Sequence, residues 1–191
     1  RSTGKVRSAV RNDSYYFKEG ITWSKISSGQ FAARFRPIGF IFDDTGRCGF
    51  SSNKVEKQIL GLFNSKISFE FLKLFCPTLS FTSNEIAKIP FSKEQFSGTI
   101  LIEELQKLSK REWDSREISW DFIQNELIKI KGQDLEETYD LYQNFWKNKF
   151  FQLHKNEEEL NRQFIEIYGL QDELTPDVPL GDITILKEEL L

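Results

Sequence analysis

The stretch QDLEETYDLYQNFWKNKFFQLHKNEEELNRQFIEIYG (residues 133–169) decides the fold of the second half of the chain. Most of its apolar side chains recur at three- and four-residue intervals, which is the period of one face of an α-helix. The members of this stripe are Leu135, Tyr139, Tyr142, Trp146, Leu153, Leu160, Phe164 and Ile167. The pattern weakens at Lys149 and Asn156, and Gly169 is suited to the left-handed C-cap of a helix. One amphipathic helix of about 55 Å is therefore predicted.

Segments upstream of this helix have the character of β-strands. In FAARFR (residues 31–36) apolar and basic side chains alternate, so Arg34 and Arg36 are expected on the face opposite Phe35. The other predicted strands are ITWSKI (residues 21–26) and FIF (residues 40–42), with a turn at DDTG (residues 43–46). These segments predict a small, mainly antiparallel sheet.

Residues 54–75 show the period of a second helix, which Pro77 would end. The character of the chain changes near residue 92, after which helical patterns dominate. The expected fold class is therefore α+β. A small mixed α/β domain over residues 1–92 is followed by a helical region over residues 93–191 that contains the long amphipathic helix.

Length and composition restrict the class of protein. The chain has 191 residues and no methionine, and it begins at Arg1, so a piece of a longer protein is expected. No stretch approaches the roughly 20 apolar residues of a membrane-spanning helix, and no signal peptide precedes the first strand. Cys48 and Cys76 are expected to be reduced, which is the usual state in the cytoplasm. A cytoplasmic protein without a membrane partner is predicted.

The charge is divided between the two halves. Residues 1–95 contain 15 Lys and Arg against 8 Asp and Glu, a net charge of +7, whereas residues 96–191 contain 11 against 21, a net charge of −10. A polyanion would meet the first half. Two differently solvated surfaces would give the same distribution.

The residues of common catalytic and metal sites are missing from the sequence. His154 is the only histidine and falls on the long helix, where a packing or surface role is expected, and two cysteines separated by 28 positions match no zinc spacing. The sequence also has no glycine-rich phosphate loop and no Asn/Asp-Pro-Pro-aromatic motif of amino-methyltransferases. No catalytic residue, metal ligand or cofactor is therefore assigned to this chain.

Three blocks of sequence together resemble a known family. The first is residues 15–29 (YYFKEGITWSKISSG) with residues 39–43, the second is residues 59–66 (ILGLFNSK) with residues 77–79 and 84–90, and the third is residues 113–115 and 119–122 with residues 160–165 and 168–174. In this order they resemble the C-terminal target-recognition region of the PglX-type adenine-specific DNA methyltransferases of BREX (bacteriophage exclusion) defence systems. The resemblance covers residues 15–175.

The resemblance implies a division of labour within a longer parent protein. A separate domain would bind S-adenosylmethionine and methylate adenine N6, and the region matching this chain would select the sequence of double-stranded DNA in phage defence or restriction-modification. The acidic helical half would be a spacer that docks to the catalytic domain of the same parent, or to other phage-defence subunits. The fragment itself is expected to be non-catalytic.

Side chains for DNA contact are expected in the basic half. Lys and Arg neutralise phosphates, and polar side chains hydrogen-bond base edges. The candidates are Lys25, Ser27, Ser28, Gln30, Arg34, Arg36, Arg47, Ser52, Asn53 and Lys54. The loop at residues 24–30 is assigned mainly to base readout, and Arg34 and Arg36 mainly to phosphate. The same residues are equally compatible with an ordinary solvated surface.

Two other interpretations stay open. In one, the chain is a protein-interaction module whose functional surface is the long helix and whose basic half is scaffold. In the other, it is a complete restriction specificity protein, although a single recognition half argues against this. Salt-sensitive duplex binding by residues 1–92 would distinguish a DNA-recognition module from a protein-interaction module.

Overall fold

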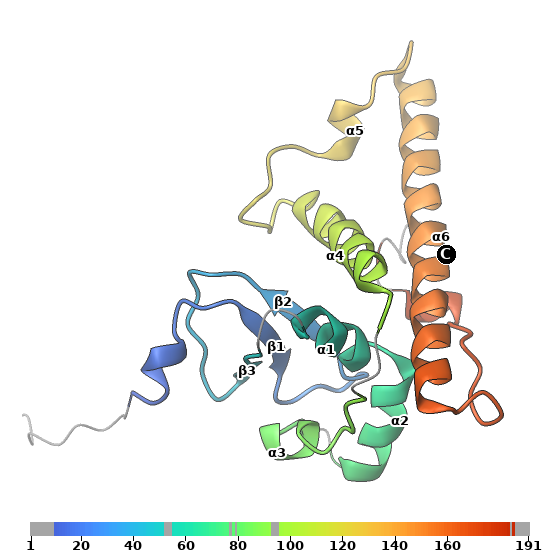
Figure 1. Ribbon diagram of the computed structural model, residues 1–191. Helices are drawn as coiled ribbons and strands as arrows, with labels where there is room; N and C mark the ends of the chain where they lie inside the picture. Colours follow the sequence, from blue (N-terminus) through green and yellow to red (C-terminus); the bar gives the residue numbers. More distant parts are fainter. Residues whose placement is uncertain are drawn as a thin grey trace, which may run out of the picture.

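The computed structural model describes residues 10–51, 55–76, 78, 80–92, 96–183 and 185. The elements in chain order are η1 (Asp13–Tyr15), β1 (Gly20–Ser24), β2 (Ala33–Arg36), β3 (Gly46–Gly49), α1 (Glu56–Phe63), α2 (Lys66–Phe75), α3 (Ser83–Ile86), α4 (Thr99–Asp114), α5 (Glu126–Lys129), α6 (Leu135–Tyr168) and η2 (Leu180–Asp182). The sheet and α1–α3 gather beside the C-terminal half of α6, and α4 and α5 lie along the rest of it (Figure 1). This arrangement confirms the α+β prediction.

The sheet has the order β2-β1-β3, and both pairings are antiparallel. Ile21, Trp23 and Ala33 on its inner face are buried, and this face packs on α1. The Trp23 indole N–H donates to the Phe81 carbonyl over 3.0 Å, so the polar atom of this buried ring is satisfied. The register pairs Thr22 with Arg34, which places both on the outer face.

The strand predicted at residues 40–42 is wrong, and the third strand is instead β3. Gly39 has a φ of 98°, which reverses the chain after β2. The Phe40 carbonyl then accepts from the Phe17 N–H over 2.9 Å rather than from a strand. The Asp43 carboxylate accepts backbone N–H bonds from Thr45 and Gly46, and this turn starts β3 against β1.

The single helix predicted over residues 54–75 is also wrong, because it breaks at Asn64 into α1 and α2. The Asn64 side chain accepts from the Ala33 N–H and donates to the Ala33 carbonyl, each over 3.0 Å. The Ser65 hydroxyl donates to the Leu62 carbonyl. Such side-chain bonds compete with the regular helix. They tie the end of α1 to the edge of the sheet and let α2 turn toward α6.

One hydrophobic core joins the predicted halves. It contains the inner face of the sheet together with Leu160 and Phe164 of α6. A Cβ atom on Gly61 of α1 would lie 2.5 Å from Ile102 Cδ1 of α4, so only glycine permits this close approach. The division into two domains, residues 1–92 and 93–191, stays a prediction. Side chains from both regions meet in this shared core.

The long helix α6 confirms the prediction for residues 133–169. Asp134 caps its start by accepting from the Glu137 N–H, and Gly169 ends it with a φ of 66°. Its buried stripe runs through Trp146, Phe150 and later residues, but the stripe does not extend to the first turns, where Leu135 is 76% exposed. No helix among the described residues is long and apolar enough to span a membrane.

The segment after α6 folds back along that helix. Ile183 and Ile185 enter a second apolar cluster with Phe150 and Leu153 of α6. His154 Nε2 lies 2.7 Å from the Val178 carbonyl oxygen, which gives the only histidine of the sequence a packing role. Burial raises the pKa of the neighbouring Glu157 carboxyl to about 7, the nearby Asp182 raises it as well, and His154 opposes them.

Glu157 should make the stability of the chain dependent on pH. Its pKa of about 7 in the folded state lies above the ordinary value of 4.5. Between pH 4.5 and about 7 the folded state therefore binds more protons than the unfolded state. The stabilising contribution is present below pH 4.5 and is lost as the pH rises through about 7. We expect Glu157→Gln to reduce this loss by up to roughly 3 kcal/mol. Urea unfolding at pH 5 and pH 8 measures it, with Glu117→Gln, an exposed carboxylate, as the control. Equal pH dependence of all three proteins would contradict the assignment.

Candidate functional site

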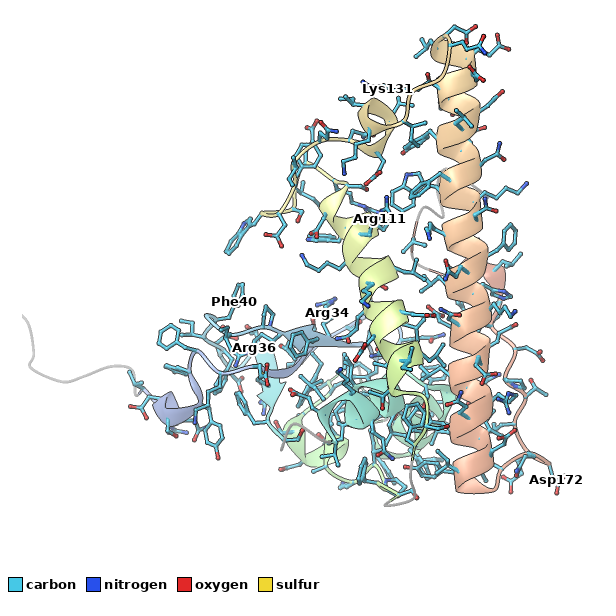
Figure 2. The ribbon with its side chains drawn as sticks, turned by 45° about the horizontal axis from the view of Figure 1, so that its top comes forward. Arg34, Arg36, Phe40, Arg111, Lys131 and Asp172 are labelled. Carbon is cyan, nitrogen blue, oxygen red and sulfur yellow. The ribbon has the colours of Figure 1, made fainter. Side chains whose placement is uncertain are left out.

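The outer face of the sheet presents one basic side chain to solvent. Arg34 is exposed on β2, and no partner for its guanidinium is found among the described residues. Thr22 beside it is occupied, because its hydroxyl donates to the Arg47 carbonyl over 2.8 Å. In Figure 2, Arg34 and Phe40 lie along the border of the sheet that faces α4. Arg34 therefore has its full hydrogen-bonding capacity available to a ligand.

Arg36 lies on the same face of β2 but is buried, with 6% of its surface exposed. Its guanidinium donates to the Phe40 carbonyl over 2.9 Å and to the Lys18 carbonyl over 2.7 Å. The rings of Phe42 and Phe50 cover it, each with its centroid 5.4 Å away. The alternation of residues in β2 predicted on which face Arg36 lies. Its burial depends on more distant segments, which contribute the Lys18 and Phe40 carbonyls and the rings of Phe42 and Phe50.

Lys25 and Arg47 converge at one end of the sheet. Lys25 Nζ and an Arg47 guanidinium nitrogen each lie 2.5 Å from an oxygen of the Asp44 carboxylate. The hydrogen bond from Lys25 lowers the pKa of Asp44, and the charge of Arg47 lowers it further. One carboxylate is thus shared between two cations, and the neighbouring Asp43 carboxylate acts on it as well.

The polar loop predicted to contact base edges connects β1 and β2 at the same end of the sheet. Ser28 and Gln30 are exposed, and Ser27 accepts the Gly29 N–H over 3.2 Å. Ser52, Asn53 and Lys54 lie outside the described residues. Among the described candidates, the structure thus brings Lys25, Arg47 and the loop together and places Arg34 along the neighbouring strand.

Two aromatic residues at the opposite end of the sheet were missed as site candidates. Trp120 is 90% exposed, although the sequence shows only that residues 113–122 are an irregular, tryptophan-rich stretch. Its ring is nearly parallel to that of Phe40, with centroids 6.2 Å apart and planes inclined by 19°. Phe40 has the spacing of a core residue but is 41% exposed. An isolated tryptophan between polar neighbours, Ser119 and Asp121, was the signal available in the sequence.

An open groove lies between α4 and the segment that follows it. Its lining is mostly charged and consists of Lys107, Lys110, Arg111, Asp114, Asp121, Ile123, Glu126 and Lys129. Lys110 pairs with both aspartates, and Arg111 and Lys129 pair with the buried carboxylate of Glu126. Burial acts to raise the pKa of Glu126, but the hydrogen bond from Lys129 and the charge of Arg111 bring it below its ordinary value.

Metal and cofactor chemistry find little support in the part of the chain that the structure describes. It holds no group of three or more His, Cys, Asp or Glu side chains arranged so that they could bind a metal ion. Cys48 and Cys76 are free thiols, and burial raises the pKa of each. The described strands are antiparallel, whereas nucleotide-type cofactors bind at the carboxyl ends of parallel strands beside glycine-rich turns. No residue is therefore assigned to S-adenosylmethionine.

Comparison with known proteins finds two similar sequences, both of which are adenine-specific methyltransferases. PglX of Lacticaseibacillus casei (strain Zhang) is 37% identical over 100% of this chain and 16% of its own length. BrxX of Escherichia coli O9:H4 (strain HS) is 36% identical over 92% of this chain and 15% of its own length. No protein-family model matches the chain.

This similarity extends along essentially the whole chain, so the chain is homologous to one segment of adenine-specific methyltransferases. Within that class, the relatives are the PglX and BrxX methyltransferases. The chain spans about a sixth of their length.

Proposed function

We propose that the chain is a DNA sequence-recognition module of an adenine-specific methyltransferase in BREX phage defence. The observation that carries this proposal is the exposed Arg34 on the outer face of the sheet, in a segment homologous to such methyltransferases. Arg34 would contact phosphate. The loop at residues 24–30 would read base edges, and Lys25 and Arg47 beside it would fix the register on the backbone.

A longer methyltransferase would supply the chemistry that this segment does not. Its catalytic domain would bind S-adenosylmethionine and transfer the methyl group to adenine N6 after the base has left the helical stack. The catalytic pocket then encloses a single base, so a second domain must inspect the neighbouring base pairs. A rigid sheet with polar loops at its end suits that role, because it holds its side chains in fixed register.

The charge of α6 favours a different task for the helical half. Residues 96–191 carry a net charge of −10, which opposes contact with phosphates. Leu135, Tyr139 and Leu141 are exposed on the first turns of α6, and Ile128 is exposed on α5. We propose that this end docks to the remainder of the methyltransferase. The same surface favours the alternative function, a protein-interaction module for another defence subunit.

Replacing Arg34 by alanine tests the DNA proposal. We expect weaker binding to a duplex of arbitrary sequence and a salt dependence reduced by about 0.9 in the slope of log affinity against log salt, because one phosphate contact is lost. Fluorescence anisotropy over a series of salt concentrations measures both. Arg162→Ala is the matched control, since Arg162 is a half-exposed arginine on acidic α6 that pairs with Glu159 and Glu166.

The proposal fails if the two arginine variants have the same affinity and salt slope as the original chain. It also fails if the chain binds no duplex at low salt. A stable complex between the chain and a defence protein, formed without any DNA binding, would instead support the interaction module.

A further inference from the structure

Trp120 presents an open aromatic face next to the proposed DNA-binding sheet. With 90% of its surface exposed, it is the most exposed of the large apolar side chains described. Trp23 and Trp146 are buried at 4% and 2%. A large apolar ring exposed to this degree is costly in water, and a contiguous group of such residues marks a binding surface. The ring thus offers an open face that a ligand can cover.

Phe40 supports this ring from the sheet. The two rings are nearly parallel, which is the arrangement of offset stacking. Their contact joins the loop after β2 to the segment between α4 and α5. Ile118 and Ile123 in that segment are 69% and 86% exposed, and Ile38 and Ile41 beside Phe40 are also exposed. We call the two rings and these exposed isoleucines, which are close to them in the sequence, the apolar tip.

The segment that carries Trp120 is much less acidic than the rest of the helical half, so it opposes contact with phosphates less. Residues 107–131 contain six Lys and Arg against five Asp and Glu, whereas the rest of residues 96–191 contain five against sixteen. Residues 107–131 are therefore nearly neutral, whereas the remainder of the helical half is strongly acidic as a whole. Exposed Lys107 lines the groove beside Lys110 and Arg111, which pair with carboxylates. Exposed Arg34 lies toward the same side of the sheet as Phe40 (Figure 2).

We propose that Trp120, supported by Phe40, is a stacking platform for one unpaired DNA base. This inference rests on the proposed function and adds a residue-level site to it. A planar base covers an exposed indole with its π-face, and the exposed cations Lys107 and Arg34 would meet the phosphates that flank that base. Insertion of apolar side chains between bases is a known way in which proteins hold DNA with a disrupted stack. Adenine methylation requires such a disruption, since the target must leave the stack.

The test uses the 191-residue chain and two labelled duplexes of the same sequence, one fully paired and one with a single unpaired adenine. We expect Trp120→Ala to weaken binding of the unpaired-base duplex by roughly 5- to 150-fold. Trp120→Phe should retain most of the affinity, because it keeps an aromatic face. Binding of the fully paired duplex should change much less. Circular dichroism of each variant verifies that it is folded.

A second aromatic pair provides a matched control on the acidic helix. Tyr139 and Tyr142 have centroids 6.4 Å apart and planes inclined by 23°, close to the geometry of Phe40 and Trp120. Tyr142→Ala should bind both duplexes as the original chain does. In a Trp113→Phe background, which removes the half-exposed tryptophan, the unpaired-base duplex should quench the long-wavelength emission that comes from Trp120.

The outcomes separate this inference from the function on which it rests. If Trp120→Ala binds both duplexes normally while Arg34→Ala does not, stacking is wrong and DNA recognition stands. Equal weakening of both duplexes by Trp120→Ala also overturns stacking, because a platform for an unpaired base must discriminate between them. If the original chain binds neither duplex, both proposals fail. If Trp120→Ala binds DNA normally but no longer binds a purified methyltransferase domain, the tip is a protein contact instead.

Discussion

Phe164→Ala is expected to reduce the free energy of unfolding by about 3–5 kcal/mol, the largest effect predicted for this chain. Phe164 is 1% exposed, and its ring stacks on Phe96 with centroids 4.7 Å apart. It also lies close to Gly61, where α1 approaches α6. Removing the ring leaves a cavity at the junction of these segments, because helices held at such short distances have little freedom to collapse into it.

Urea unfolding measures this loss, and Phe151→Ala is its control. Phe151 is an aromatic residue on the same helix with 47% of its surface exposed, so its removal should cost less than about 1 kcal/mol. With the other three tryptophans replaced by phenylalanine, fluorescence of the buried Trp23 reports on the sheet, and far-ultraviolet circular dichroism reports on the helices. Both signals should shift together, because the sheet and α6 share one core. A variant in which the helical signal is lost while Trp23 stays buried would show that the two regions unfold independently.

Arg36→Ala is expected to destabilise the chain by about 2–4 kcal/mol, the second largest effect. The substitution removes a buried guanidinium and leaves the carbonyl oxygens of Lys18 and Phe40 without these donors. Bonds to charged donors contribute roughly 1.5–3 kcal/mol each, and their loss is only partly offset by water. The contacts with Phe42 and Phe50 are lost as well.

Its neighbour on β2 provides the comparison. Arg34→Ala removes an exposed side chain from the same face and should change the free energy of unfolding by less than about 0.5 kcal/mol. For DNA binding we expect the larger effect from Arg34→Ala, which should weaken duplex binding although the variant is fully folded. Arg36→Ala should weaken duplex binding only to the extent that part of the protein is unfolded. Arg36→Lys should restore part of the stability, since it can serve one carbonyl. If Arg36→Ala is as stable as the original chain but loses salt-dependent binding, Arg36 is a phosphate contact and the structural role is wrong.

The candidate site was only partly predictable from the chain. The alternation in residues 31–36 correctly places Arg34 and Arg36 on one face of a strand. It could not separate them, because the burial of Arg36 depends on Phe42, in the loop after β2, and on Phe50, which follows β3. The apolar sequence of residues 40–42 predicts a strand that contains Phe40. Its exposure follows from the left-handed turn at Gly39, which no hydrophobic period records.

The sequence by itself determined the elements whose signal is local. The length of α6 follows from its apolar period and from the caps Asp134 and Gly169, and these depend only on residues within one or two helical turns. Tertiary structure alone decided where the helix predicted over residues 54–75 breaks, because Asn64 bonds to Ala33 on a strand 31 positions earlier. It also decided that Trp120 meets Phe40 across 80 positions of chain. The physical reason is the same in both cases. Side-chain hydrogen bonds and ring contacts between distant segments depend on how those segments are brought together in space. A periodic pattern of apolar residues describes only one face of one helix or strand.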